Sequence, residues 1–119
     1  MSDQTPWPSE LRVSKDKSEL TVAFDGERFT LPAEMLRVLS PSAEVQGHSP
    51  EQRVTVPGKR HVKITQVLPI GNYAVRLVFD DRHDSGIFTW VYLHELGVSG
   101  NEKWAGYLAE LAAKGLGRG

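Results

Sequence analysis

The sequence predicts an α+β fold: a two-layer sandwich of antiparallel strands, with a short helix after the first hairpin and a second helix at the C-terminus. Three observations support this prediction. Apolar residues alternate in several short runs, which is typical of strands with one buried face. Short turns containing glycine separate neighbouring runs, which favours antiparallel pairing. Two other segments, near residues 35 and 107, carry apolar residues at the spacing of a helix.

The first half of the domain is predicted to hold three strands and a helix. A short strand is expected at 11–13, and a β-hairpin is expected at 19–31. The hairpin turns at Asp25-Gly26, and this dipeptide is typical of a type I′ turn. Pro32 follows directly and suits the first turn of a helix, where its missing N–H is no loss.

The second half is predicted to form a further antiparallel sheet. Strands are expected at 62–68 and 73–79, joined by a turn, and a third at 87–90. The alternation in the second of these strands places four side chains on the core face: Tyr73, Val75, Leu77 and Phe79. Arg76 lies on the opposite face, which is therefore expected to be partly open or to hold a carboxylate partner.

The C-terminal part is predicted to be helical in two pieces. One or two turns after the third strand end at Gly97, and Asn101 serves as the N-cap of the last helix. Residues 1–10 are expected to be a flexible lead-in and residues 115–119 to fray. A single domain is therefore predicted over residues 11–114.

Composition excludes several classes of function. The formal net charge of the 119 residues is −1, so no general electrostatic attraction to nucleic acid or an anionic membrane is expected. Cysteine is absent, which excludes disulfides, a thiolate nucleophile and Cys-ligated metal clusters. The sequence has no leader-like start and no apolar run of transmembrane length, so we expect a cytoplasmic protein.

Most of the candidate binding residues lie in or beside one polar turn, residues 80–86. An inward fold of this turn would bring carboxylates and an imidazole onto one cation, with His83 as the candidate metal ligand. Alternatively, the aspartates bond their own backbone amides, as they commonly do in turns. Two aromatic residues flank the turn and read either as core residues or as a binding platform. The candidate binding residues are Asp80, Asp81, His83, Asp84, Trp90 and Tyr92.

Several of these motifs together resemble the gamma-butyrobetaine hydroxylase-like N-terminal domain, which also occurs as a stand-alone bacterial protein. The resemblance rests on Gly71-Asn72-Tyr73-Ala74-Val75, Asp80-Asp81-Arg82-His83 and Ser85-Gly86-Ile87-Phe88-Thr89-Trp90, with Asp25-Gly26 and Leu31-Pro32 upstream. It covers roughly Leu11 to Leu96.

The resemblance carries expectations about catalysis and metal. In the hydroxylases a separate jelly-roll domain performs the iron-dependent reaction. The chain ends before such a domain could begin, so we expect no enzyme activity. Some members bind zinc through three cysteines and a histidine that corresponds to His83. The cysteine positions fall at about Ser40, Ser42 and Val45, so we expect no zinc or other cofactor.

Three functions are compatible with these observations. The favoured one is a non-catalytic module that docks a protein partner, as a monomer or weak homodimer. The alternative is a metal-binding or metal-delivery protein that uses His83 and the neighbouring aspartates; the resemblance links such domains to iron–sulfur assembly. The third is a small enzyme with a site between the polar turn and a long polar loop at 44–60.

Overall fold

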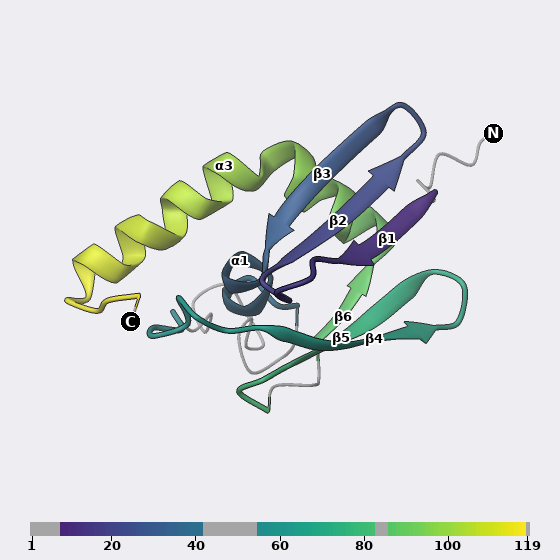
Figure 1. The fold of residues 1–119 in the computed structure, drawn as a ribbon. Coiled ribbons are helices and arrows are strands. Elements are labelled where there is room, and N and C mark those ends of the chain that lie inside the picture. Colours follow the sequence, from purple (N-terminus) through teal and green to yellow (C-terminus); the bar gives the residue numbers. More distant parts are fainter. Residues whose placement is uncertain (1–7, 42–54, 83–85, 119) are drawn as a thin grey trace.

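The computed structural model describes residues 8–41, 55–82 and 86–118. These residues form two three-stranded antiparallel sheets, a short helix and a long C-terminal helix, which confirms the predicted α+β fold (Figure 1). In chain order the elements are β1 (Glu10–Val13), β2 (Glu19–Phe24), β3 (Glu27–Pro32), α1 (Ala33–Val38), β4 (Ile64–Ile70), β5 (Ala74–Phe79), β6 (Gly86–Thr89) and α3 (Trp90–Ala113).

The first sheet has the order β1-β2-β3, so β1 and β3 are its edges. The predicted hairpin is present, with Phe24 opposite Glu27 and a two-residue turn between them. The predicted turn type is wrong, because a type I′ turn requires positive φ at both central residues and only Gly26 has it, at 80°. Asp25 therefore keeps ordinary backbone geometry.

The second sheet has the order β4-β5-β6, with a register shift between Ile64 and Gln66. Val75, Leu77 and Phe79 lie in the core, as the alternation predicts. Tyr73 does not, because β5 begins one residue later and Tyr73 belongs to the preceding turn, where its side chain is 53% exposed. Strand alternation does not extend into a turn.

The C-terminal half is helical in two pieces that meet at a kink and together form α3. Thr89 caps α3, since its side chain accepts a hydrogen bond of 3.0 Å from the backbone N–H of Tyr92. The backbone departs from helical geometry at Ser99 (φ −111°, ψ 15°), while Gly97 and Asn101 lie inside the helix. The prediction of two helical pieces is thus confirmed, but the break falls at Ser99, so Gly97 is not the end of the first piece and Asn101 is not the cap of the second.

A single core joins both sheets and both helices, with α1 between the sheets (Figure 1). Every residue of α1 is buried, including the charged residues Glu34 and Arg37. The largest fully buried side chains of the core come from all parts of the fold and include Leu20, Leu36, Phe79, Phe88, Leu93 and Tyr107. Among the described residues, no helix combines the length and the apolar character that crossing a bilayer requires.

The end of the chain contacts the body of the domain. Residues 115–118, for which the sequence predicts fraying, include Arg118, whose guanidinium donates two hydrogen bonds of 2.9 and 2.8 Å to the Glu34 carboxylate. The backbone N–H of Gly58 also donates to the carbonyl of Gly117 at 3.0 Å. The two bonds from Arg118 satisfy the buried Glu34 carboxylate of α1.

Candidate functional site

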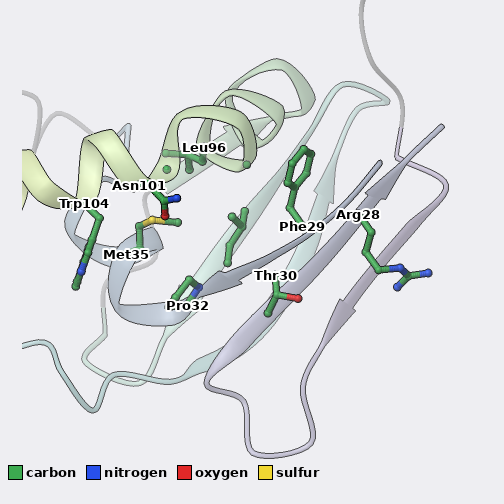
Figure 2. Close-up of a pocket in the computed structure, with 11 residues that line it drawn as sticks. Arg28, Phe29, Thr30, Pro32, Met35, Leu96, Asn101 and Trp104 are labelled. Carbon is green, nitrogen blue, oxygen red and sulfur yellow. The ribbon is translucent and has the colours of Figure 1, made fainter. Parts of the chain in front are cut away.

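A groove of about 390 Å³ lies between β3 and the kinked part of α3 (Figure 2). This volume falls within the range of ligand pockets in proteins. Its floor is apolar and its rim is polar. The lining residues are Arg28, Phe29, Thr30, Leu31, Pro32, Met35, Leu96, Gly97, Gly100, Asn101 and Trp104.

One wall of the groove follows a strand along its length. Residues 28–32 line it in an unbroken run, and they belong to β3, an edge of the first sheet. Within the described residues, β3 pairs only with β2. The groove therefore follows a strand edge, where the outward backbone groups have no partner strand.

The opposite wall is a face of α3 on which two residues have no side chain. Gly97 and Gly100 are three residues apart and so lie on one side of the helix. A Cβ atom at Gly97 would lie 2.4 Å from Cγ of Phe29, so the absence of a side chain lets the ring approach the helix backbone. A Cβ at Gly100 would lie 3.6 Å from the Met35 Sδ and Cε atoms, an ordinary contact, so a small side chain there would meet Met35 without a clash.

The two ends of the groove carry polar or aromatic groups. Arg28 stands at one end (Figure 2). Its guanidinium forms an ion pair of 2.9 Å with Glu10. Trp104 stands at the other end, and the guanidinium of Arg118 lies 5.3 Å from the centroid of its ring. An apolar floor between polar ends suits a segment that buries one apolar side chain and bonds through its flanks.

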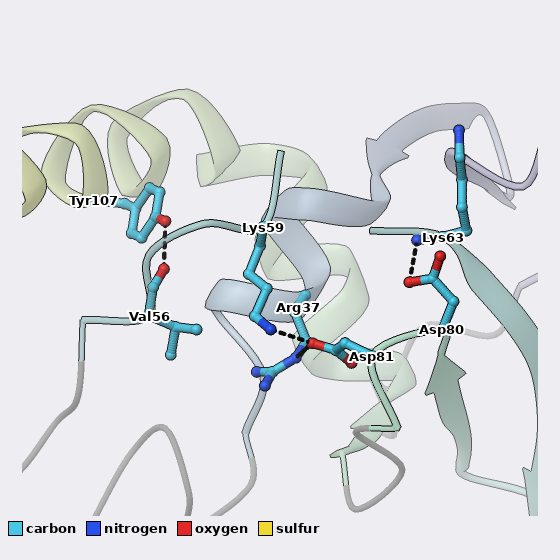
Figure 3. Close-up of polar contacts among 7 residues, drawn as sticks. All are labelled: Arg37, Val56, Lys59, Lys63, Asp80, Asp81 and Tyr107. Atoms are coloured by element: carbon cyan, nitrogen blue, oxygen red, sulfur yellow. Dashed lines mark hydrogen bonds and ion pairs between the residues drawn. The ribbon is translucent and has the colours of Figure 1, made fainter. Parts of the chain in front are cut away.

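The two described aspartates of the polar turn point to different partners (Figure 3). Asp80 accepts a hydrogen bond of 3.1 Å from the backbone N–H of Lys63, while its own N–H donates to the Lys63 carbonyl at 2.9 Å. Asp81 binds the Nε atom of Arg37 at 2.8 Å and Nζ of Lys59 at 2.7 Å. Asp80 thus closes the open end of the β4–β5 pair, and Asp81 joins α1 to the segment before β4.

His83 and Asp84 lie outside the described residues. Within the described part of the chain, no three His, Asp or Glu side chains are grouped closely enough to hold a metal ion. The role of His83 as a metal ligand stays a prediction.

The two aromatic candidates bond to backbone carbonyls. Trp90 is largely buried and donates from Nε1 to the carbonyl of Asn72 at 3.0 Å. The Tyr92 hydroxyl donates to the carbonyl of Leu39 at 2.5 Å. Both residues thereby fix the start of α3 to distant parts of the chain, and their role in ligand binding stays a prediction.

Sequence reasoning missed the groove. Gly97 was interpreted as a helix end and Asn101 as a cap, while Arg28 and Thr30 were interpreted as ordinary strand residues. The signal that could have revealed the groove is the spacing of Gly97 and Gly100 within a stretch of helical periodicity, since paired glycines on one helix face indicate close approach of another element.

Comparison with known proteins identifies relatives of the whole fold. The family model described as gamma-butyrobetaine hydroxylase-like, N-terminal, matches residues 11–94. A protein solved by solution NMR is 49% identical, with a TM-score of 0.83 over 96% of this chain and 90% of that chain. A second NMR structure is 44% identical, with a TM-score of 0.81 over 99% of this chain and 90% of that one.

A third relative is known from a crystal structure. It is a protein of unknown function from Acidithiobacillus ferrooxidans that belongs to the DUF971 family. It is 39% identical, with a TM-score of 0.65 over 81% of this chain and 98% of that chain. No curated protein matches the sequence.

Proposed function

Because the chain belongs to the gamma-butyrobetaine hydroxylase-like N-terminal family, we propose that it is a non-catalytic interaction domain whose groove between β3 and α3 holds an extended segment of a partner protein. The observation that carries this proposal is the course of the groove along an edge strand.

An extended segment suits the groove better than a helix does. The run from residue 28 to residue 32 spans about 17 Å of strand, and a segment laid beside it would bond to the free edge of β3. Main-chain hydrogen bonds would supply affinity, and alternate side chains of the segment would enter the groove. The helix wall permits this because Gly100 carries no side chain.

The floor of the groove defines the side chain that it accepts. Leu31, Met35 and Leu96 are buried apolar residues, so the central anchor of the segment should be apolar. The side chain of Met35 can adapt to apolar anchors of different shape, since methionine is unbranched and flexible. Arg28 and Asn101 would bond to polar groups at the flanks of the anchor.

The experiment is affinity capture with three forms of the protein from the cytoplasm of the organism that produces it. Gly100→Leu fills the groove from its helix wall. Gly106→Leu adds the same side chain to the same helix at a position where nothing lies within 4 Å of a Cβ. All three forms are first compared by circular dichroism and urea unfolding, so that loss of binding is not confused with loss of folding.

We expect one partner to be recovered with the wild type and with Gly106→Leu, and to be depleted with Gly100→Leu. Amide hydrogen exchange on the purified complex should then be slowed in β3. Equal recovery with both leucine variants, or protection that leaves β3 unchanged, would show that the groove is not the docking site. Recovery of no specific partner would count against the function as a whole.

A further inference from the structure

The outer face of the second sheet carries a single charged residue in an apolar surrounding. Strand alternation in β5 sends Val75 and Leu77 into the core and places Arg76 on the opposite face. In the sheet register, Arg76 lies between Leu68 of β4 and Ile87 of β6. We call this surface the Arg76 face; it comprises Gln66, Leu68, Ile70, Arg76, Val78 and Ile87.

The Nε atom of Arg76 lacks an acceptor. It is buried and has no hydrogen-bond partner among the described residues, and Arg76 forms no ion pair with any of them. The register gives the reason, because both cross-strand neighbours are aliphatic and offer no side-chain oxygen. A buried, unpaired donor of a charged group is costly and calls for an explanation.

The surroundings of Arg76 would strengthen any bond that it makes. Leu68 and Val78 are half-buried and Ile87 is 41% exposed, so an anion that reaches the guanidinium would also cover aliphatic surface. Excluding water from an ion pair raises its electrostatic strength. Two neighbouring N–H groups of a guanidinium match the two oxygens of a carboxylate.

We propose that the Arg76 face binds a protein segment that presents an aspartate or glutamate flanked by aliphatic side chains. The carboxylate would accept from the terminal nitrogens of Arg76, and the aliphatic neighbours would cover Leu68 and Ile87. This surface belongs to the second sheet and is independent of the groove, whose strand belongs to the first sheet.

Two other occupants fit the charge less well. Nucleic acid binding depends on several cations, whereas this face carries one and the whole chain has a net charge of −1. A second copy of the chain, bound through the same face about a two-fold axis, would bring two Arg76 guanidiniums together, and their like charges would repel. An acidic segment of another protein supplies the opposite charge.

The test is selection of random peptides, displayed on phage, against the full chain. Peptides that are enriched are synthesised with a fluorophore, and their dissociation constants are measured by anisotropy. The variants are Arg76→Gln, which removes the charge, and Arg76→Lys, which keeps the charge but cannot donate two parallel hydrogen bonds to one carboxylate. Arg76→Met keeps the aliphatic stem and removes the buried nitrogen, so it should fold with a melting temperature no lower than that of the wild type. Gly100→Leu blocks the groove and serves as the control.

We expect the enriched peptides to share an acidic residue beside aliphatic ones. Their affinity should fall about tenfold or more in Arg76→Gln and Arg76→Met, fall less in Arg76→Lys, and stay unchanged in Gly100→Leu. Enrichment of peptides without an acid, affinity that is insensitive to Arg76→Gln, or the absence of any enriched peptide would overturn the proposal. A dimer in sedimentation that dissociates in Arg76→Gln would overturn it too, by making a second copy the occupant.

Discussion

Replacing Gly97 with alanine should destabilise the protein although it adds a good helix former to a helix. Gly97 lies inside α3 and does not have positive φ, so its backbone geometry accepts alanine without strain. The obstacle is the ring of Phe29. A Cβ at this position would lie 2.4, 2.5 and 2.7 Å from three carbon atoms of that ring, distances at which either the ring or the helix must move.

The size of the effect follows from two opposing contributions. Alanine in place of glycine favours a helix by about 1 kcal/mol. Forcing an extra carbon into a packed contact costs about 1–3 kcal/mol. Gly106 gives the first contribution alone, because a Cβ there meets nothing within 4 Å. The free energy of unfolding of Gly97→Ala should therefore be about 1–3 kcal/mol below that of Gly106→Ala.

Urea unfolding followed by circular dichroism measures this difference directly. Adding Phe29→Leu to Gly97→Ala should recover part of the loss, and the two changes should be non-additive by about 0.5–3 kcal/mol. If Gly97→Ala and Gly106→Ala gain the same stability, the Phe29 ring does not pack on the backbone of α3. The contact between β3 and α3, and the shape of the groove between them, would then be wrong.

Four further predictions concern other parts of the fold. Phe79→Ala should lower the free energy of unfolding by about 2–5 kcal/mol, since the ring is fully buried; a near-wild-type melting temperature would contradict its place in the core. Asp81→Asn should cost about 1–3 kcal/mol in urea unfolding, because it removes the charge that pairs with the buried Arg37 guanidinium at 2.8 Å, and an unchanged midpoint would refute this. Tyr107→Phe should cost about 1 kcal/mol near neutral pH, because the hydroxyl donates to a backbone carbonyl at 2.5 Å. Burial raises the pKa of Tyr107. The stability that the hydroxyl contributes should therefore be complete below the ordinary tyrosine pKa and lost as the pH rises through the raised pKa. A stability difference between the wild type and Tyr107→Phe that persists unchanged in strong alkali would contradict this. Elemental analysis of the purified wild type and of His83→Ala should find no stoichiometric zinc in either protein, because the sequence has no cysteine ligands. One zinc per chain in the wild type that is lost in the variant would establish a metal site.

The local pattern of the sequence was enough to predict most strands. Val75, Leu77 and Phe79 alternate with more polar neighbours, and a period of two can bury only one face of a strand. The Asp25-Gly26 pair marked the hairpin because glycine takes up positive φ at little cost. These features depend on residues that are close in the chain, so they can be read without knowledge of the fold.

The candidate site depended on contacts between distant residues. The Phe29 ring packs against Gly97, and this close approach of β3 and α3 forms one wall of the groove. The pairing of Arg37 with Asp81 links positions 44 residues apart. Residue periodicity contains no information about which surfaces meet, so the groove could not be predicted from it.

The sequence by itself determined the class of fold, the positions of the strands and the exclusion of cysteine chemistry, because each follows from composition or from local spacing. Only the tertiary structure decided that the Phe29 ring packs against Gly97 and that Nε of Arg76 has no acceptor among the described residues. The reason is that both outcomes depend on the neighbours that folding brings to these residues. Those neighbours come from other strands of the sheets and are not adjacent in the chain.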